Sequence, residues 1–114
     1  MHVNANGERI AIAVLVEEGN RNAEADKLLR SLHGRSGDVR LAQFGANAFL
    51  PKRREYFRYP GSETVPPCRE GVSWIVLADP MTLSGDQIDR FAKLVGKNAR
   101  PLQALNGRMP LRSR

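Results

Sequence analysis

The alternation of apolar and polar residues divides the chain into predicted strands and helices. Seven consecutive apolar residues at positions 10–16 predict a strand over residues 8–16 that is buried on both faces, as in the interior of a sheet. Short apolar and β-branched runs predict further strands over residues 39–44, 55–59 and 72–77. We expect the last two strands to pair as neighbours, because one polar loop joins them.

Apolar residues at helical spacing predict two surface helices. Residues 22–33 carry an i, i+3, i+4, i+7 stripe, and Asn22 is in place to cap the first turn. Residues 85–95 form the second helix, which Ser84 and Gln87 introduce with the spacing of a capping box. The side chains expected to be buried on this helix are Ile88, Phe91, Ala92 and Val95.

The remaining segments have no clear period. Residues 35–38 are predicted to form a loop, and residues 46–50 a turn or a single helical turn. Prolines and a glycine interrupt residues 97–114, which should form an extended packing segment that ends in a disordered basic tail over 109–114. No linker or repeat divides residues 1–114, so we expect part of one domain.

Composition and charge exclude several kinds of partner. The 41% content of hydrophobic residues is ordinary for a small globular protein of 114 residues. The net charge of +6 is spread along the chain without a nucleic-acid motif, so we expect no nucleic-acid partner. The apolar runs are too short to span a bilayer, and residues 1–7 lack signal-peptide features, so we expect no membrane contact and a cytoplasmic location for the chain as written. These patterns do not predict the oligomeric state.

Few residues are suited to metal or nucleophilic chemistry. His2 and His33 lie on different predicted elements, and the His-x-His and His-x-x-x-His spacings of zinc sites are absent. His33, near a helix C-terminus, is better explained as a favourable cation there. Cys68 is the single cysteine and lacks a context that would lower its pKa, so we expect a structural thiol. These residues predict no metal site.

The most informative stretch is residues 59–74, where a Pro-Gly turn and a proline-stiffened loop lead into a strand. Its sequence, Tyr-Pro-Gly-Ser-Glu-Thr-Val-Pro-Pro-Cys-Arg-Glu-Gly-Val-Ser-Trp, resembles the α-class carbonic anhydrases. Residues 98–108, Asn-Ala-Arg-Pro-Leu-Gln-Ala-Leu-Asn-Gly-Arg, and residues 7–19 resemble further segments of that family. The likeness covers nearly the whole chain, but only the C-terminal half of the family domain. It implies a mixed α+β, mainly β fold, with a large, mostly antiparallel sheet and peripheral helices.

The resemblance also implies a chemistry, the reversible hydration of carbon dioxide to bicarbonate with a zinc cofactor. Thr64 matches the family threonine that accepts a hydrogen bond from zinc-bound hydroxide and donates one to a glutamate, which orients the hydroxide. In the family, zinc lowers the pKa of its bound water so that hydroxide forms near neutral pH. The residues that match the substrate pocket are Ala11, Val65, Val72 and Trp74. Val72 and Trp74 are equally consistent with an ordinary core strand.

Several positions depart from the family pattern. His2 aligns best with the second histidine of a family segment whose first histidine binds zinc, and on this alignment all three zinc ligands are missing. An alternative alignment places His2 on that first histidine and retains one ligand. Glu63 replaces a leucine, which would cost about one to several kcal/mol if the carboxylate were buried unpaired. Val65 replaces a threonine, and Ala11 stands where the family usually has valine.

The sequence therefore predicts a truncated α-carbonic anhydrase. We expect this chain to bind no zinc alone and to be inactive unless the N-terminal half of the domain complements it, with an open strand edge and an uncovered apolar face. One alternative is a non-enzymatic binding module for an acidic partner, through Arg53, Arg54 and Arg58, or a degenerate carbonic-anhydrase-related protein. Another is a misassigned start, since full-length relatives are often periplasmic or secreted.

Overall fold

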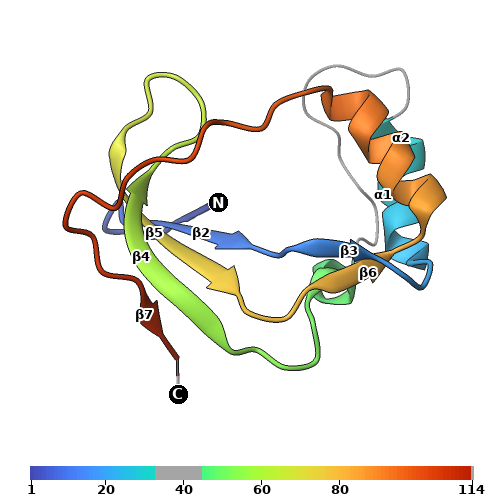
Figure 1. Cartoon of the computed structure of the whole chain (residues 1–114), viewed down its shortest axis with the longest axis horizontal. Helices are drawn as coiled ribbons and strands as arrows, with labels where there is room; N and C mark the ends of the chain where they lie inside the picture. The colour runs from blue at the N-terminus through green and yellow to red at the C-terminus, as the bar shows by residue number, and fades with distance from the viewer. Residues whose placement is uncertain (33–44, 114) are drawn as a thin grey trace. The chain divides into compact units, whose positions relative to one another are not determined.

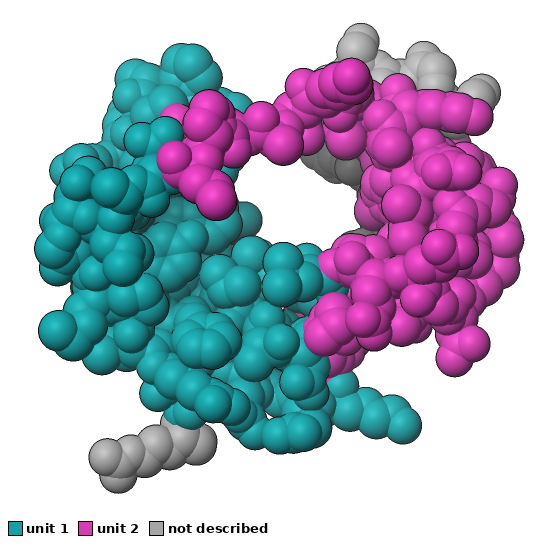
Figure 2. Space-filling model, viewed as in Figure 1, with its two compact units in different colours: residues 1–15, 52–79, 103–114 teal, residues 16–51, 80–102 magenta. Residues whose placement is uncertain are grey.

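A computed structural model describes residues 1–32 and 45–113 of the chain (Figure 1). Its contacts divide the chain into two compact units, each assembled from separate stretches of sequence (Figure 2). The first unit consists of residues 1–15, 52–79 and 103–114. The second unit consists of residues 16–51 and 80–102. Within the described residues, neither α-helix combines the length and the apolar character that crossing a membrane requires.

The first unit is built on a five-stranded sheet with the order β1-β2-β5-β4-β7. The strands are β1 (His2–Val3), β2 (Arg9–Ala13), β4 (Tyr56–Ser62), β5 (Glu70–Leu77) and β7 (Leu111–Arg112). Only the β2–β5 pair of this sheet is parallel. The predicted pairing of the strands on either side of the polar loop is confirmed, since β4 and β5 are antiparallel neighbours. The sheet is therefore mixed and mostly antiparallel, as the resemblance implied.

The strand predicted over residues 8–16 is two strands. β2 ends at Ala13, and Val16 begins β3 (Val16–Glu18), which belongs to the second unit. The prediction of burial on both faces was wrong, because Ala11 is buried whereas Ile12 is 50% exposed. An uninterrupted apolar run does not reveal that only one face of a sheet is covered. The expected open edge is covered only in part, because β1 pairs with Arg9 and Ile10 and, within the described strands, residues 11–13 of β2 pair with β5 alone.

The disordered tail predicted over residues 109–114 is corrected by β7. Leu111 lies opposite Arg58, and the Ser113 amide donates to the Tyr56 carbonyl oxygen at 2.8 Å. The Ser113 hydroxyl in turn accepts a hydrogen bond from the Tyr56 amide at 2.9 Å. A strand of two residues is too short to show a period in the sequence, and its partners lie far away along the chain. Pairing with β4 orders a segment whose composition suggested disorder.

The second unit combines two helices with a small sheet (Figure 1). It contains α1 (Ala23–Leu32), the 3-10 helix η1 (Ala46–Phe49), α2 (Gly85–Val95), and the parallel strands β3 and β6 (Met81–Leu83). Both predicted α-helices and the short turn before Pro51 are confirmed. The loop predicted at 35–38 and the strand predicted at 39–44 lie outside the described residues.

Each α-helix begins where a side chain caps its first turn. The Asn22 carboxamide oxygen accepts hydrogen bonds from the amides of Glu24, at 2.9 Å, and Ala25, at 3.2 Å. Ser84 and Gln87 form the predicted capping box at α2. These caps satisfy amide groups that have no partner within the helix.

The predicted buried face of α2 is only partly buried. Ile88 and Phe91 are half-buried, but Ala92 and Val95 are exposed. Gln87, a polar residue, is the fully buried side chain of this helix. The apolar stripe of α2 therefore lies largely open, and a polar contact anchors the helix to its unit.

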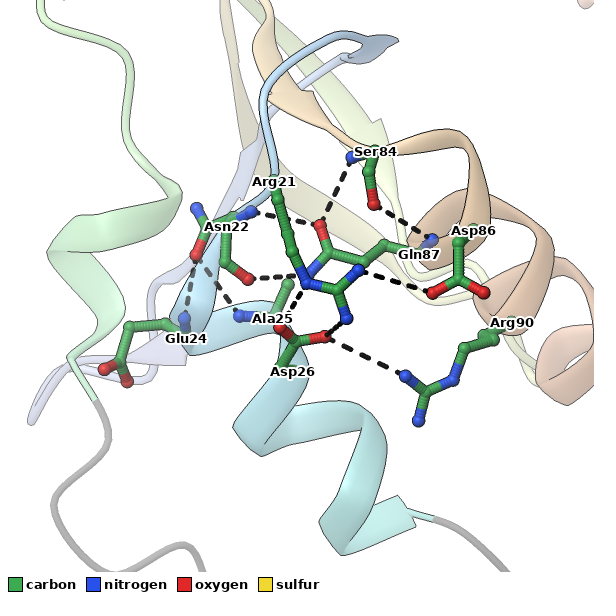
Figure 3. Close-up of polar contacts among 9 residues, drawn as sticks. All are labelled: Arg21, Asn22, Glu24, Ala25, Asp26, Ser84, Asp86, Gln87 and Arg90. Atoms are coloured by element: carbon green, nitrogen blue, oxygen red, sulfur yellow. Dashed lines mark hydrogen bonds and ion pairs between the residues drawn. The ribbon is translucent and has the colours of Figure 1, made fainter.

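Gln87 joins the starts of the two helices (Figure 3). Its side-chain oxygen accepts hydrogen bonds from the amides of Asn22 (3.0 Å) and Ser84 (3.2 Å), and its nitrogen donates to the Asn22 carbonyl oxygen (2.7 Å). Beside it, Arg21 binds both carboxylate oxygens of Asp26 at 2.8 Å. The Arg21 guanidinium therefore holds the pKa of Asp26 below its ordinary value.

Candidate functional site

The loop between β4 and β5 carries Thr64 on a backbone with two internal hydrogen bonds. The Glu63 amide donates to the Arg69 carbonyl oxygen at 2.9 Å, and the Cys68 amide donates to the Val65 carbonyl oxygen at 2.9 Å. Cys68 adopts a positive φ of 56°, and the peptide bond between the two prolines is cis. The loop is therefore a tight, closed turn, and Thr64 lies immediately before its tip.

Trp74 holds the base of this loop. Its indole nitrogen donates to the Ser62 carbonyl oxygen at 3.0 Å. Gly61 allows this contact, because a Cβ atom at that position would lie 2.7 Å from Cδ1 of the indole ring. The predicted Pro-Gly turn is instead part of β4, paired with β5, and its glycine is needed for the close approach of the Trp74 ring.

The strand register places three of the four predicted pocket residues side by side on one face of the sheet. Ala11 lies opposite Trp74 on neighbouring strands, and Val72 precedes Trp74 by one full strand repeat. Val72 is 1% exposed and Ala11 is also buried, so both are packed within the unit. Val65, the fourth, lies in the loop and is 64% exposed. The structure thus gathers Ala11, Val72 and Trp74, and leaves Val65 on the surface.

Thr64 is exposed, and within residues 1–32 and 45–113 its hydroxyl has no hydrogen-bond partner. The group can therefore both donate and accept a hydrogen bond. Two grooves lie near this part of the sheet, of about 440 Å³ and about 310 Å³. Neither is lined by Thr64, Val65 or Trp74, whereas Val72 lines the smaller groove.

The charge at Glu63 has a partner that sequence reasoning missed. Oε1 of Glu63 lies 3.6 Å from Nε of Arg9, and the two side chains are 14% and 28% exposed. The predicted penalty for an unpaired buried carboxylate therefore does not arise. Only the tertiary fold brings β2 to this loop, and no spacing in the sequence links the two residues.

The side chains that could bind a metal lie apart from one another in the described residues. His2 lies exposed on β1, and His33 is outside the described residues. Cys68 is a half-buried free thiol. Within residues 1–32 and 45–113, no three histidine, cysteine, aspartate or glutamate side chains gather as a metal site requires.

A sequence model of eukaryotic-type carbonic anhydrase matches residues 2–113. The chain belongs to this family. A carbonic anhydrase from Neisseria gonorrhoeae is 40% identical over 111 residues, which are 96% of this chain and 44% of the relative. One from Klebsiella pneumoniae is 40% identical over 112 residues, 96% of this chain and 46% of the relative.

Solved structures give the same result for the fold. The α-carbonic anhydrase of Thermovibrio ammonificans, solved with the inhibitor sulfanilamide, has a TM-score of 0.87 at 38% identity and is matched over 50% of its chain. The α-carbonic anhydrase of Photobacterium profundum has a TM-score of 0.86 at 40% identity, over 51% of its chain. In both cases 96% of this chain is covered. The α-carbonic anhydrase fold is confirmed, and the chain spans about half the length of these relatives.

Proposed function

We propose that this chain supplies the substrate-facing part of a carbonic anhydrase site, which interconverts carbon dioxide and bicarbonate. Membership of the family supports the reaction class. The observation that carries the proposal is the loop that presents an unpaired Thr64 hydroxyl, with its base held by the bond from Trp74 to Ser62. A rigid loop on a strand scaffold is a common way to position a catalytic group.

In this proposal Thr64 orients the attacking oxygen. Its hydroxyl accepts a hydrogen bond from hydroxide and so directs a lone pair of that oxygen at the carbon of carbon dioxide. A new C–O bond forms, one C=O bond becomes a C–O⁻ single bond, and the product is bicarbonate. Val65 and the half-buried Trp74 supply apolar surface for the uncharged substrate, while Ala11 and Val72 are buried on the same face of the sheet as Trp74.

We further propose that hydration requires the part of the domain that this chain does not cover. Relatives are matched over only 44% to 51% of their length. The family is zinc-dependent, and within the described residues no three potential metal ligands gather. In this proposal the zinc ligands come from the part of the domain that this chain does not cover, and the chain alone binds no stoichiometric zinc.

Complementation tests this proposal. The chain is co-expressed with the N-terminal half of the Neisseria gonorrhoeae relative, and zinc content and carbon dioxide hydration are measured on the purified pair and on each part alone. We expect zinc and activity only in the pair. Thr64→Val, which keeps the shape and removes the hydroxyl, should lower the rate by about a hundredfold, whereas Thr64→Ser should retain most of it. A pair without activity, or a fully active Thr64→Val variant, would refute the proposal.

A binding module for an acidic partner has less support. Arg53 already contacts Glu55 at 2.7 Å and Asp79 at 3.7 Å, and Nε of Arg58 donates to the Ser73 hydroxyl at 2.9 Å. Of the three proposed arginines, only Arg54 is left without a contact within the described residues. An unchanged partner profile after charge reversal at all three positions would remove this alternative. A degenerate relative is the outcome if complementation restores zinc but no hydration.

A further inference from the structure

The ion pair of Arg9 and Glu63 lies beside residues that match the family's substrate pocket, since Arg9 precedes Ala11 by one strand repeat. Arg9 begins β2 and is opposite Val72, so its side chain leaves the sheet on the same face as Ala11 and Trp74. Glu63 directly precedes Thr64. Both charged side chains are more than two thirds buried. A partly desolvated guanidinium therefore stands one strand repeat from the pocket residues.

This ion pair is open. The 3.6 Å separation of Arg9 Nε and Glu63 Oε1 exceeds the 2.7–2.9 Å of a charge-assisted hydrogen bond. Within the described residues, the Arg9 side chain makes no hydrogen bond and no other ion pair. A guanidinium has five N–H donors in a planar fork. Within the described residues, no acceptor lies within hydrogen-bond distance of these donors in Arg9. It can bind a ligand without first breaking a hydrogen bond.

We propose that Arg9 is a binding site for a small planar oxyanion at the edge of the pocket, with Glu63 as its internal competitor. The fork matches the two oxygens of a carboxylate-type group, which it binds through two parallel hydrogen bonds. Glu63 keeps the site neutral when empty and weakens anion binding by repulsion. The choice of bicarbonate as the ligand rests on the proposed function, whereas the oxyanion site rests on the geometry of Arg9 and Glu63 alone.

Bicarbonate binding to the metal-free chain tests the site separately from catalysis. ¹⁵N-labelled chain is titrated with sodium bicarbonate, and in parallel with sodium chloride, at constant pH and ionic strength in metal-free buffer. The amide signals of Arg9 and Glu63 and the indole signal of Trp74 are followed. We expect a saturable shift of these signals with bicarbonate only. An equal response to chloride, or no saturable response, would overturn the proposal and leave the complementation test unaffected.

Two variants with matched controls assign the site. Arg9→Gln should weaken bicarbonate binding at least about tenfold, because two charge-assisted hydrogen bonds are lost. Arg54→Gln, which removes an exposed arginine of the same unit, should bind like the parent. Glu63→Gln should bind bicarbonate several-fold more tightly, whereas Glu17→Gln, at an exposed position of the other unit, should not. Unchanged or weaker binding by Glu63→Gln would contradict the proposal even if Arg9→Gln failed to fold.

Discussion

Replacement of Gln87 by methionine should destabilise the second unit by about 2 kcal/mol. Gln87 is fully buried, and methionine matches its length and its helix propensity, so the change removes hydrogen bonds and leaves the packing nearly intact. The amides of Asn22 and Ser84 lose their acceptor. The Asn22 carbonyl oxygen keeps the Asp26 amide as a donor, at 3.3 Å. Each of the two amides left without an acceptor costs about 1 kcal/mol, which together gives the estimate. This cost is at the low end of the range of about 1–3 kcal/mol for a buried unsatisfied group, because both residues are only half-buried.

Urea unfolding followed by circular dichroism at 222 nm measures this effect. Among the described residues both α-helices belong to the second unit, so the helical signal follows its unfolding. Lys93→Met is the matched control, since it introduces the same residue at an exposed position of the same helix and should change stability by less than about 0.5 kcal/mol. A Gln87→Met variant as stable as this control would show that the Gln87 bonds contribute nothing net.

Two further predictions concern the first unit. Gly61→Ala places a Cβ atom 2.7 Å from the Trp74 ring, so it should lower the free energy of unfolding by about 1–3 kcal/mol. It should also shift the fluorescence emission of Trp74, the single tryptophan of the chain. Unchanged emission and an unchanged melting temperature would refute the contact. Arg53 and, after it, Arg112 hold the pKa of Glu55 below its ordinary value. The Arg112 bond to Glu55 is therefore fully present above the ordinary glutamate pKa and lost as the pH falls through the lowered one. The protection of the β7 amides against hydrogen exchange should therefore fall on acidification. A Glu55→Gln variant that keeps this pH dependence would contradict its assignment to the Glu55 carboxylate.

Elements with a local cause could be predicted from the sequence. The Asn22 cap and the Ser84–Gln87 box use residues a few positions apart, and both helices begin where these signals place them. Which residues are buried on α2 could not be predicted from the sequence. A stripe of apolar residues indicated burial through Val95, yet the tertiary structure leaves Val95 exposed and buries Gln87. Periodicity indicates which residues share a face, and the rest of the fold decides whether that face is covered.

The candidate site also has a part that could be predicted from the sequence and a part that could not. The Thr64 loop was found because its residues are contiguous and resemble a family motif. Arg9 gave no such signal, because its role depends on β2 lying parallel to β5 and near the loop that precedes it. Glu63 departs from the family pattern, and the sequence alone predicted a cost for burying its carboxylate unpaired. The structure places Arg9 beside it, so this cost does not arise. The effect of a single substitution in a motif therefore cannot be judged until its spatial neighbours are known.

All five candidate residues, Ala11, Thr64, Val65, Val72 and Trp74, belong to the first unit, and contacts within that unit hold the loop. The geometry of the loop is thus set by β4, β5 and the Trp74 indole. Within the described residues, the hydrogen bonds that hold the loop come from the first unit. A loop organised in this way can be in place before the metal ligands are supplied, since its hydrogen bonds are already made. Complementation would then need to deliver only the zinc-binding side chains, and this makes restored activity a demanding test of the proposed function.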